Sequence, residues 1–101
     1  MKILSEPIIF DWDLGNIFKN LKKHKVTVQE SEEVFGNEPF IEEDTKHSTV
    51  YEQRFQGLGK TKLARKLFIV FTIRNNKVRV ISIRDMNKKE VVQYETLEKN
   101  S

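Results

Sequence analysis

The segment from Lys66 to Arg84 reads KLFIVFTIRNNKVRVISIR, and this pattern predicts an antiparallel β-hairpin. Its first half contains the run Leu67 to Phe71, which is apolar on both faces of a strand and is therefore typical of a central strand. Asn75-Asn76 then gives a tight-turn signal, because asparagine tolerates the positive φ angles of such turns. The hairpin indicates that an antiparallel sheet dominates the fold.

The turn also fixes which side chains of the hairpin share a face. With Asn75-Asn76 at the tip, Arg74 pairs with Lys77 and Thr72 pairs with Arg79. Basic side chains are therefore expected to line one end of a sheet face, with a C-terminal helix covering or flanking the opposite part.

Two further strands are expected before the hairpin. Phe40 to Glu43 fits a short edge strand, and a polar loop follows it. Val50 to Leu58 alternates as a strand does, with Tyr51 and Phe55 on one face. Gly57-Leu58-Gly59 fits the end of this strand entering a turn, and the segment 59–65 fits a basic loop. The sheet is thus expected to have three or four strands.

Two helices are expected near the N-terminus, after a short strand or extended segment at 8–11. Asp13 is suited to cap the first helix. One apolar face of that helix is formed by Leu14, Ile17, Phe18 and Leu21.

Capping-box signals mark the starts of the other two helices. Thr27 to Glu30 begins a helix that ends at Gly36. Asn87 to Glu90 begins a C-terminal helix that runs through Leu97. The predicted fold class is α+β: two N-terminal helices, an antiparallel sheet and a C-terminal helix.

The composition predicts a single domain over residues 1–101 that needs neither a metal nor a disulfide. The chain has no cysteine, which excludes thiol redox chemistry and a cysteine-based zinc site. No signal peptide is apparent, and the longest apolar run is too short to cross a bilayer. We therefore expect a cytoplasmic protein without membrane attachment.

Charge is distributed unevenly along the chain. Residues 1–53 hold 6 Lys and Arg against 11 Asp and Glu, whereas residues 54–101 hold 12 against 4. Clustered cations indicate a polyanionic partner, because they repel one another until a partner neutralises them. RNA is the expected substrate, although a basic face that only keeps the protein soluble stays open as an alternative.

The residues suit phosphodiester chemistry better than other reactions. RNA cleavage without a metal needs proton transfer at two oxygens and cations at the developing phosphorane charge. Arginine binds phosphate oxygens with two parallel hydrogen bonds. The strand arginines are Arg54, Arg74, Arg79 and Arg84, and the candidates for proton transfer are His24, Glu90 and Tyr94.

Each of these candidates has a structural alternative. His24 can simply complement the end of its helix, and Glu90 can serve only the capping box. Tyr94 and Trp12 fit core residues with one polar group. No metal or cofactor is expected, because the two histidines lie outside any metal-binding spacing and the acidic run at 42–44 fits a solvated loop.

Taken together, the motifs resemble the BrnT toxins. The matching segments, in chain order, are Phe10-Asp11-Trp12-Asp13, Asn20-Leu21-Lys22-Lys23-His24 with Val26, Val34-Phe35, Arg54-Phe55, Leu58-Gly59, Phe71-Thr72 with Arg74, Arg79-Val80-Ile81-Ser82 with Arg84, Lys89-Glu90 and Tyr94-Glu95. They cover nearly all of residues 10–95 in order.

The resemblance implies a RelE-like toxin fold and a ribonuclease that arrests translation. It implies a cognate BrnA-type antitoxin with a ribbon-helix-helix DNA-binding domain. It further implies a toxin–antitoxin heterotetramer that contacts operator DNA only through the antitoxin. A non-catalytic module that binds nucleic acid or protein is the alternative.

The resemblance also suggests roles for individual residues. Arg54 and Arg84 would contact the scissile phosphate, His24 or Glu90 would transfer protons, and Lys23 would hold a flanking phosphate. The remaining expected site residues are Tyr94 in the catalytic set, and Trp12, Arg74, Arg79, Lys88 and Lys89 in RNA binding.

Two positions depart from the family pattern. Lys25 replaces the glycine that commonly follows the histidine, so we expect a different helix ending. Asp85 follows Arg84, where a second basic residue is usual, and an acid there should weaken RNA binding by repelling phosphate. Residues 1–9 form an extension that the resemblance does not explain.

Overall fold

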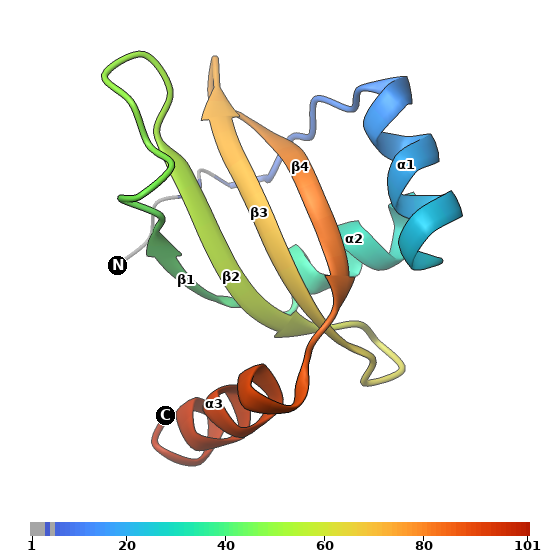
Figure 1. Ribbon diagram of the computed structural model, residues 1–101, viewed down its shortest axis with the longest axis vertical. Helices are drawn as coiled ribbons and strands as arrows, with labels where there is room; N and C mark the ends of the chain where they lie inside the picture. The colour runs from blue at the N-terminus through green and yellow to red at the C-terminus, as the bar shows by residue number, and fades with distance from the viewer. Residues whose placement is uncertain (1–3, 5) are drawn as a thin grey trace.

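The computed structural model has the predicted α+β order, with four strands in the sheet (Figure 1). It describes residue 4 and residues 6–101, so residues 1–3 and 5 of the N-terminal extension lie outside the described part. The elements are α1 (Leu14–His24), α2 (Val28–Gly36), β1 (Phe40–Glu43), β2 (Arg54–Lys60), β3 (Lys66–Arg74), β4 (Lys77–Asp85) and α3 (Lys88–Lys99).

All neighbouring strands of the sheet are antiparallel, in the order β1-β2-β3-β4. The predicted hairpin register is confirmed, since Arg74 pairs with Lys77 and Thr72 with Arg79. Asn75 and Asn76 have φ angles of 53° and 63°, as a tight turn between twisted strands requires. The segment at 8–11 makes only one bridge to the sheet, between Phe10 and Val78.

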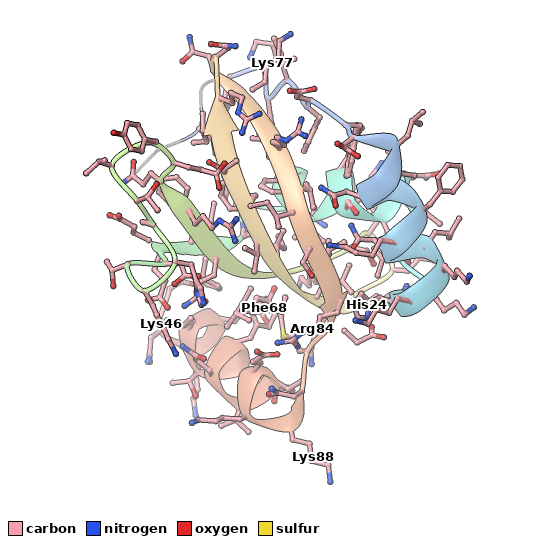
Figure 2. All side chains as sticks on the ribbon, turned by 45° about the horizontal axis from the view of Figure 1, so that its top comes forward. His24, Lys46, Phe68, Lys77, Arg84 and Lys88 are labelled. Carbon is pink, nitrogen blue, oxygen red and sulfur yellow. The ribbon has the colours of Figure 1, made fainter. Side chains whose placement is uncertain are left out.

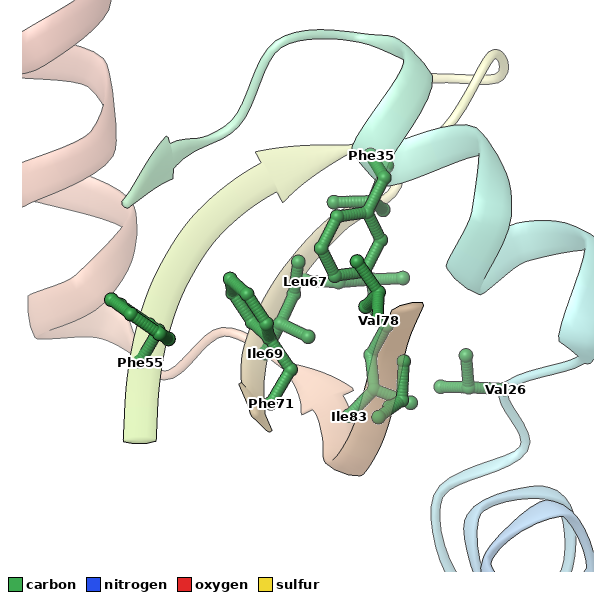
Figure 3. Packing of buried hydrophobic residues seen from close by; sticks show 10 residues of the cluster. Val26, Phe35, Phe55, Leu67, Ile69, Phe71, Val78 and Ile83 are labelled. Carbon is green, nitrogen blue, oxygen red and sulfur yellow. The ribbon is translucent and has the colours of Figure 1, made fainter. Parts of the chain in front are cut away.

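The core lies on one face of the sheet, beneath α2 (Figure 3). Phe71 of the central strand is fully buried and contacts two other rings. Its centroid is 5.1 Å from that of Phe35, edge to face, and 5.4 Å from that of Phe55. Such pairs add about 0.5–1.5 kcal/mol each beyond the burial of their area. These contacts fix α2 against β2 and β3.

The predicted strand at 50–58 begins later than expected, at Arg54. The preceding backbone is held in a loop by polar side chains. Thr49 Oγ1 accepts from the backbone N–H groups of Tyr51 and Glu52, and Ser48 Oγ accepts from that of Arg54. Such local bonds compete with the strand ladder. Tyr51 therefore lies exposed in the loop and does not share a face with Phe55.

The same strand also continues past the expected turn at residues 57–59, because β2 ends at Lys60. Gly59 is buried and pairs with Leu67 of β3. A Cβ atom at Gly59 would lie 2.6 Å from Val34 Cγ1 and 3.0 Å from Pro39 Cβ. The absence of a side chain at Gly59 is what lets α2 approach β2 this closely.

Helix α1 lies along the outer edge of β4 (Figure 1), beyond the bridge between Phe10 and Val78, and its polar side chains bond to that edge. Asn16 Nδ2 donates to Val80 O at 3.3 Å, and Lys19 Nζ donates to Ile81 O at 3.0 Å. The buried Asn20 accepts from the N–H of Ile83. An edge strand has unpaired backbone groups, and these three side chains satisfy them.

The opposite, apolar side of α1 is consequently exposed. Leu14 is 70% exposed, Phe18 64% and Leu21 44%. Ile17, which the sequence pattern placed on the same apolar face, is half-buried. Periodicity detected an apolar face, but the polar edge of β4 determined which way the helix is turned.

The expectation of a different ending for α1 at Lys25 is wrong. Lys25 adopts the left-handed conformation, with φ 58° and ψ 35°. Its N–H donates to the carbonyls of Asn20 and Leu21, as in a helix that ends at glycine. The lysine therefore takes the backbone shape that glycine favours.

Both predicted capping boxes are confirmed, at Thr27 for α2 and at Asn87 for α3. Helix α3 packs on the sheet face opposite the core, at the end remote from the hairpin turn, as expected (Figure 1). Among the described residues, no helix combines the length and apolar character needed to cross a bilayer.

Candidate active site

The sheet face opposite the core carries most of the predicted cationic residues. Strand alternation places the side chains of β2, β3 and β4 on this face, which we call the open face. Its members on these strands are Arg54, Gln56, Leu58, Lys60, Lys66, Phe68, Val70, Thr72, Arg74, Lys77, Arg79, Ser82 and Arg84.

Helix α3 covers the end of the open face that is remote from the turn between β3 and β4. Tyr94 is buried there, with its ring centroid 5.7 Å from that of Phe40. A groove of about 730 Å³ begins between α3 and the sheet and extends around the edge strand β1. Leu58, Phe68 and Glu90 line its α3 end, and three further carboxylates line the rest of it, those of Glu6, Glu38 and Glu42.

Arg84 and Glu90 form an ion pair with two hydrogen bonds in this region. Arg84 Nη1 donates to Glu90 Oε1 at 2.8 Å, and Arg84 Nη2 donates to Glu90 Oε2 at 3.0 Å. The guanidinium also lies over the ring of Phe68, 4.4 Å from its centroid. Contact with an aromatic face and a two-point hydrogen bond both restrict the guanidinium plane. Arg84 is therefore held with its fork against Glu90, which lines the groove.

The pKa of Glu90 is lowered by this setting. Burial by itself raises the pKa, but the hydrogen bonds from Arg84 and from the N–H of Asn87 outweigh it, and the charge of Arg84 adds to them. Glu90 is thus a carboxylate at neutral pH, and it accepts hydrogen bonds as a proton acceptor would.

His24 lies at the same end of the sheet as Arg84, whereas Lys77 lies at the other end (Figure 2). The pKa of Asp85 is lowered chiefly by its hydrogen bond from Arg65, and the charge of His24 contributes. The carbonyl of Asp85 also accepts from Arg84 Nη1 at 3.1 Å. His24 therefore lies near the Asp85 carboxylate, at the same end of the sheet as the Arg84–Glu90 pair, where β4 leads into α3.

Arg54 and Arg74 lie at the other end of the open face, where both pair with Glu52. Arg54 Nε is 3.0 Å from Glu52 Oε1, and Arg74 Nη2 is 3.1 Å from Glu52 Oε2. These contacts, with the charges of the two arginines, lower the pKa of Glu52 despite its partial burial. Arg79, at the same level, pairs with Asp11 at 3.4 Å and Asp13 at 3.0 Å.

The two arginines that were expected at one phosphate are thus not brought together. Arg54 lies opposite Thr72 on β3, and Arg84 lies opposite Phe68, four residues further along. Four residues of a strand span about 13 Å. Each arginine also has its own carboxylate partner.

Two of the other expected site residues have packing contacts instead. Trp12 stacks on Phe10 and donates from Nε1 to Glu32 of α2, so it lies toward the core side of the sheet. Tyr94 donates from its hydroxyl to Glu98, and burial, together with Glu98, raises the pKa of Tyr94 to about 12.

The expected lysines flank the Arg84 end of the sheet. Lys23 is exposed in the last turn of α1, and Lys88 and Lys89 are exposed in the first turn of α3. Lys88 points away from the molecule (Figure 2). Within residue 4 and residues 6–101, no cluster of three histidine or acidic side chains could hold a metal ion.

Comparison with known protein families decides the identity of the chain. Residues 12–90 match the family described as the ribonuclease toxin BrnT of type II toxin–antitoxin systems. The chain belongs to the BrnT family. It is therefore a type II toxin of the ribonuclease class, for which RNA is the substrate and a cognate antitoxin the partner. No curated protein matches the chain significantly.

The BrnT match ends at Glu90, so it includes the whole Arg84–Glu90 pair. The departure at Asp85 has a local explanation in this BrnT chain. Arg65 Nε and Nη2 donate to the two carboxylate oxygens of Asp85 at 2.8 and 3.0 Å. The charge that was expected to repel phosphate is therefore offset by Arg65.

Sequence reasoning missed three residues of this BrnT site. Phe68 could have been found, because alternation places it on the face opposite Leu67 and Ile69. Glu52 stands two residues before Arg54 in the sequence, and this proximity was a weaker indication that the two side chains pair. Arg65 gave none beyond its place in a basic loop, because its partners lie far away in the chain.

Proposed function

We propose that this BrnT toxin cleaves RNA without a metal ion at the α3 end of the open face. The observation that carries the proposal is the Arg84–Glu90 pair, whose carboxylate lines the groove. Arginine is suited to bind the charged phosphorane, and a hydrogen-bonded carboxylate is suited to accept a proton.

In the proposed reaction, Glu90 accepts the proton of a ribose 2′-OH while that oxygen attacks the adjacent phosphorus. Arg84 donates to the nonbridging oxygens, on which negative charge develops. The bond from phosphorus to the 5′-oxygen breaks, and His24 donates a proton to that leaving oxygen. The products are a 2′,3′-cyclic phosphate and a 5′-hydroxyl.

Binding of RNA would also activate the base. Arg84 must turn at least part of its hydrogen bonding from Glu90 to the phosphate. Since hydrogen bonding from Arg84 is a main cause of the lowered pKa of Glu90, this exchange raises that pKa. Glu90 then accepts a proton more readily when a phosphate is present than when the site is empty.

Arg54 and Arg74 have a separate role in this proposal. Arg54 lies about 13 Å and Arg74 about 20 Å along the sheet from Arg84, which suits flanking phosphates of the same RNA strand better than the scissile one. Lys23, Lys88 and Lys89 would contribute further phosphate contacts. Trp12 and Tyr94 then stabilise the fold and do not touch the RNA.

The partner proposed for this toxin is a BrnA-type antitoxin with a ribbon-helix-helix domain. Membership of a type II family supports a protein antitoxin. We further propose two copies of each protein in the complex, with operator DNA contacted through the antitoxin alone.

The test is an RNA-cleavage assay in EDTA, with both naked RNA and ribosome-bound message as substrates. We expect Arg84→Ala and Glu90→Gln to lower kcat/KM by about 100-fold or more, as loss of a transition-state donor does. Arg54→Ala should mainly raise KM. Lys99→Ala, a cation on the last turn of α3, is the matched control and should cleave normally.

Two results would contradict the proposal. Activity that disappears with EDTA would require a metal. Failure to cleave either substrate, with salt-sensitive RNA binding retained, would favour the non-catalytic binding module. A substrate with deoxyribose at the cleavage site should remain intact, since the attacking 2′-oxygen is missing.

A further inference from the structure

The exposed apolar side of α1 is a feature that the catalytic proposal does not use. Its residues, which we call the α1 stripe, are Leu14, Phe18 and Leu21. They follow one another at spacings of four and three residues, so they form a continuous line along the helix. Large apolar side chains gathered in this way on a surface indicate a binding site.

The polar side of the same helix explains why the stripe cannot simply turn inward. Asn16, Lys19 and Asn20 bond to backbone atoms of β4, and Asn20 is buried in doing so. Rotating α1 to bury the stripe would remove all three contacts and leave the edge of β4 unsatisfied. The stripe is therefore built to face outward while the fold stays intact.

The charges around the stripe indicate the chemistry of what covers it. Residues 14–25 contain no Asp or Glu, and the end of α1 carries Lys22 and Lys23 in its last turn and Lys25 at its C-cap. A second copy of the chain would bring like charges together, which disfavours self-association through this face. An acidic segment with apolar side chains at helical spacing is complementary in both respects.

We propose that the α1 stripe is a docking site for an acidic amphipathic segment of the antitoxin. This inference rests on the proposed function only in taking the partner from the type II toxin class. Because the stripe lies outside the sheet edge and not on the open face, the antitoxin would hold the toxin at a second place besides the active site. Three apolar side chains are too small an area for stable attachment to a membrane.

The experiment uses the full chain and, as the probe, the antitoxin encoded beside the toxin gene. The variant is Leu14→Gln with Phe18→Gln, in which both positions keep good helix formers. The matched control is Val50→Gln with Leu63→Gln, which removes two side chains that are 93% and 94% exposed outside α1. Dissociation constants for the antitoxin and RNA-cleavage rates are measured on all three proteins.

We expect the α1 variant to bind the antitoxin at least about 30-fold more weakly, as loss of a central apolar contact does. The control should bind within about 2-fold of the original chain, and all three proteins should cleave RNA equally. Cleavage is measured separately, so an inactive original chain would refute the catalytic proposal while the affinities still test this one.

Three results would overturn the proposal. One is unchanged antitoxin affinity in the α1 variant. The second is a dimer of the chain alone that the α1 substitutions dissociate, which would assign the stripe to a second copy. The third is binding to vesicles with anionic headgroups that only the α1 variant loses, which would assign it to a membrane surface.

Discussion

Lys25 is a lysine in a backbone conformation that glycine usually occupies. The left-handed conformation costs a residue other than glycine about 1–2 kcal/mol of conformational energy, and Lys25 adopts it with φ 58°. The helix ends correctly because the N–H of Lys25 still caps the last turn. The local strain is thus offset by contacts that do not depend on the lysine side chain.

Replacing this lysine with the glycine that is common in the BrnT family should stabilise the protein. We expect Lys25→Gly to raise the free energy of unfolding by about 0.5–1 kcal/mol, measured by urea denaturation. The control Lys22→Gly lies inside α1 and should lower it by about 1 kcal/mol. Equal effects of the two substitutions would contradict the role given to the left-handed backbone.

Glu90 gives a prediction about pH. Its folded-state pKa is lowered from the ordinary 4.5, so its carboxylate contributes stability above pH 4.5 and loses this contribution as the pH falls through the lower folded-state value. Glu90→Gln can keep the capping box through its amide oxygen, and it removes the charge together with the hydrogen bond that Oε2 accepts from Arg84 Nη2.

We therefore expect Glu90→Gln to be less stable than the original chain by about 1–2 kcal/mol at neutral pH. The difference should disappear in acid, below pH 4.5. Denaturation curves across this range test it. If the stability difference between the two proteins does not change with pH, the charge of Glu90 is not what stabilises the original chain.

At the scale of the elements, the sheet could be predicted from sequence because its signals are local. Apolar periodicity and the Asn75-Asn76 turn placed β3 and β4 within a residue of their ends. The start of β2 could not be placed, because it depends on bonds from Ser48 and Thr49 that alternation does not report.

The candidate site divides in the same way. Strand register was enough to place Arg74 and Arg79 on one face. The pairing of Arg84 with Glu90 could not be foreseen, because it depends on the angle at which α3 leaves β4. The direction of the apolar side of α1 depended on the unpaired edge of β4, which no pattern within α1 encodes.

The contact between α2 and β2 depends on one missing side chain. Because a Cβ atom at Gly59 would lie 2.6 Å from Val34 Cγ1, Gly59→Ala should lower the free energy of unfolding by about 1–3 kcal/mol. The control Gly36→Ala has no atom within 4 Å and lies in α2, so it should leave stability unchanged or raise it slightly. Thermal or urea denaturation distinguishes the two.

At the scale of the whole molecule, Arg65 joins segments that are far apart in the chain. Its guanidinium donates to the carbonyls of His24 and Lys25, to Glu30 of α2 and to Asp85 of β4. The hydrogen bonding that Arg65 donates to Asp85 is the largest of the effects that raise the pKa of Arg65, and Glu30 adds to it. The positions of His24 and Asp85 are therefore set by one side chain.

Arg65→Met should lower the free energy of unfolding by about 2 kcal/mol, since it leaves two carboxylates and two carbonyls without this donor in a half-exposed place. RNA cleavage should also fall, because His24 is no longer fixed. Lys62→Met, in the same turn, should change neither property. If a folded Arg65→Met protein cleaves RNA at the original rate, the proposed role of His24 as proton donor is contradicted.

The way α1 is attached has a consequence for how such toxins diversify. The helix is held by side chains that bond to the backbone of β4, so Leu14 and Phe18, which are 70% and 64% exposed, contribute little to keeping the fold together. Substitutions at these two positions can therefore accumulate without unfolding the protein. A duplicated gene could change its antitoxin preference through these positions alone, and sister pairs in one cell would then cease to cross-neutralise.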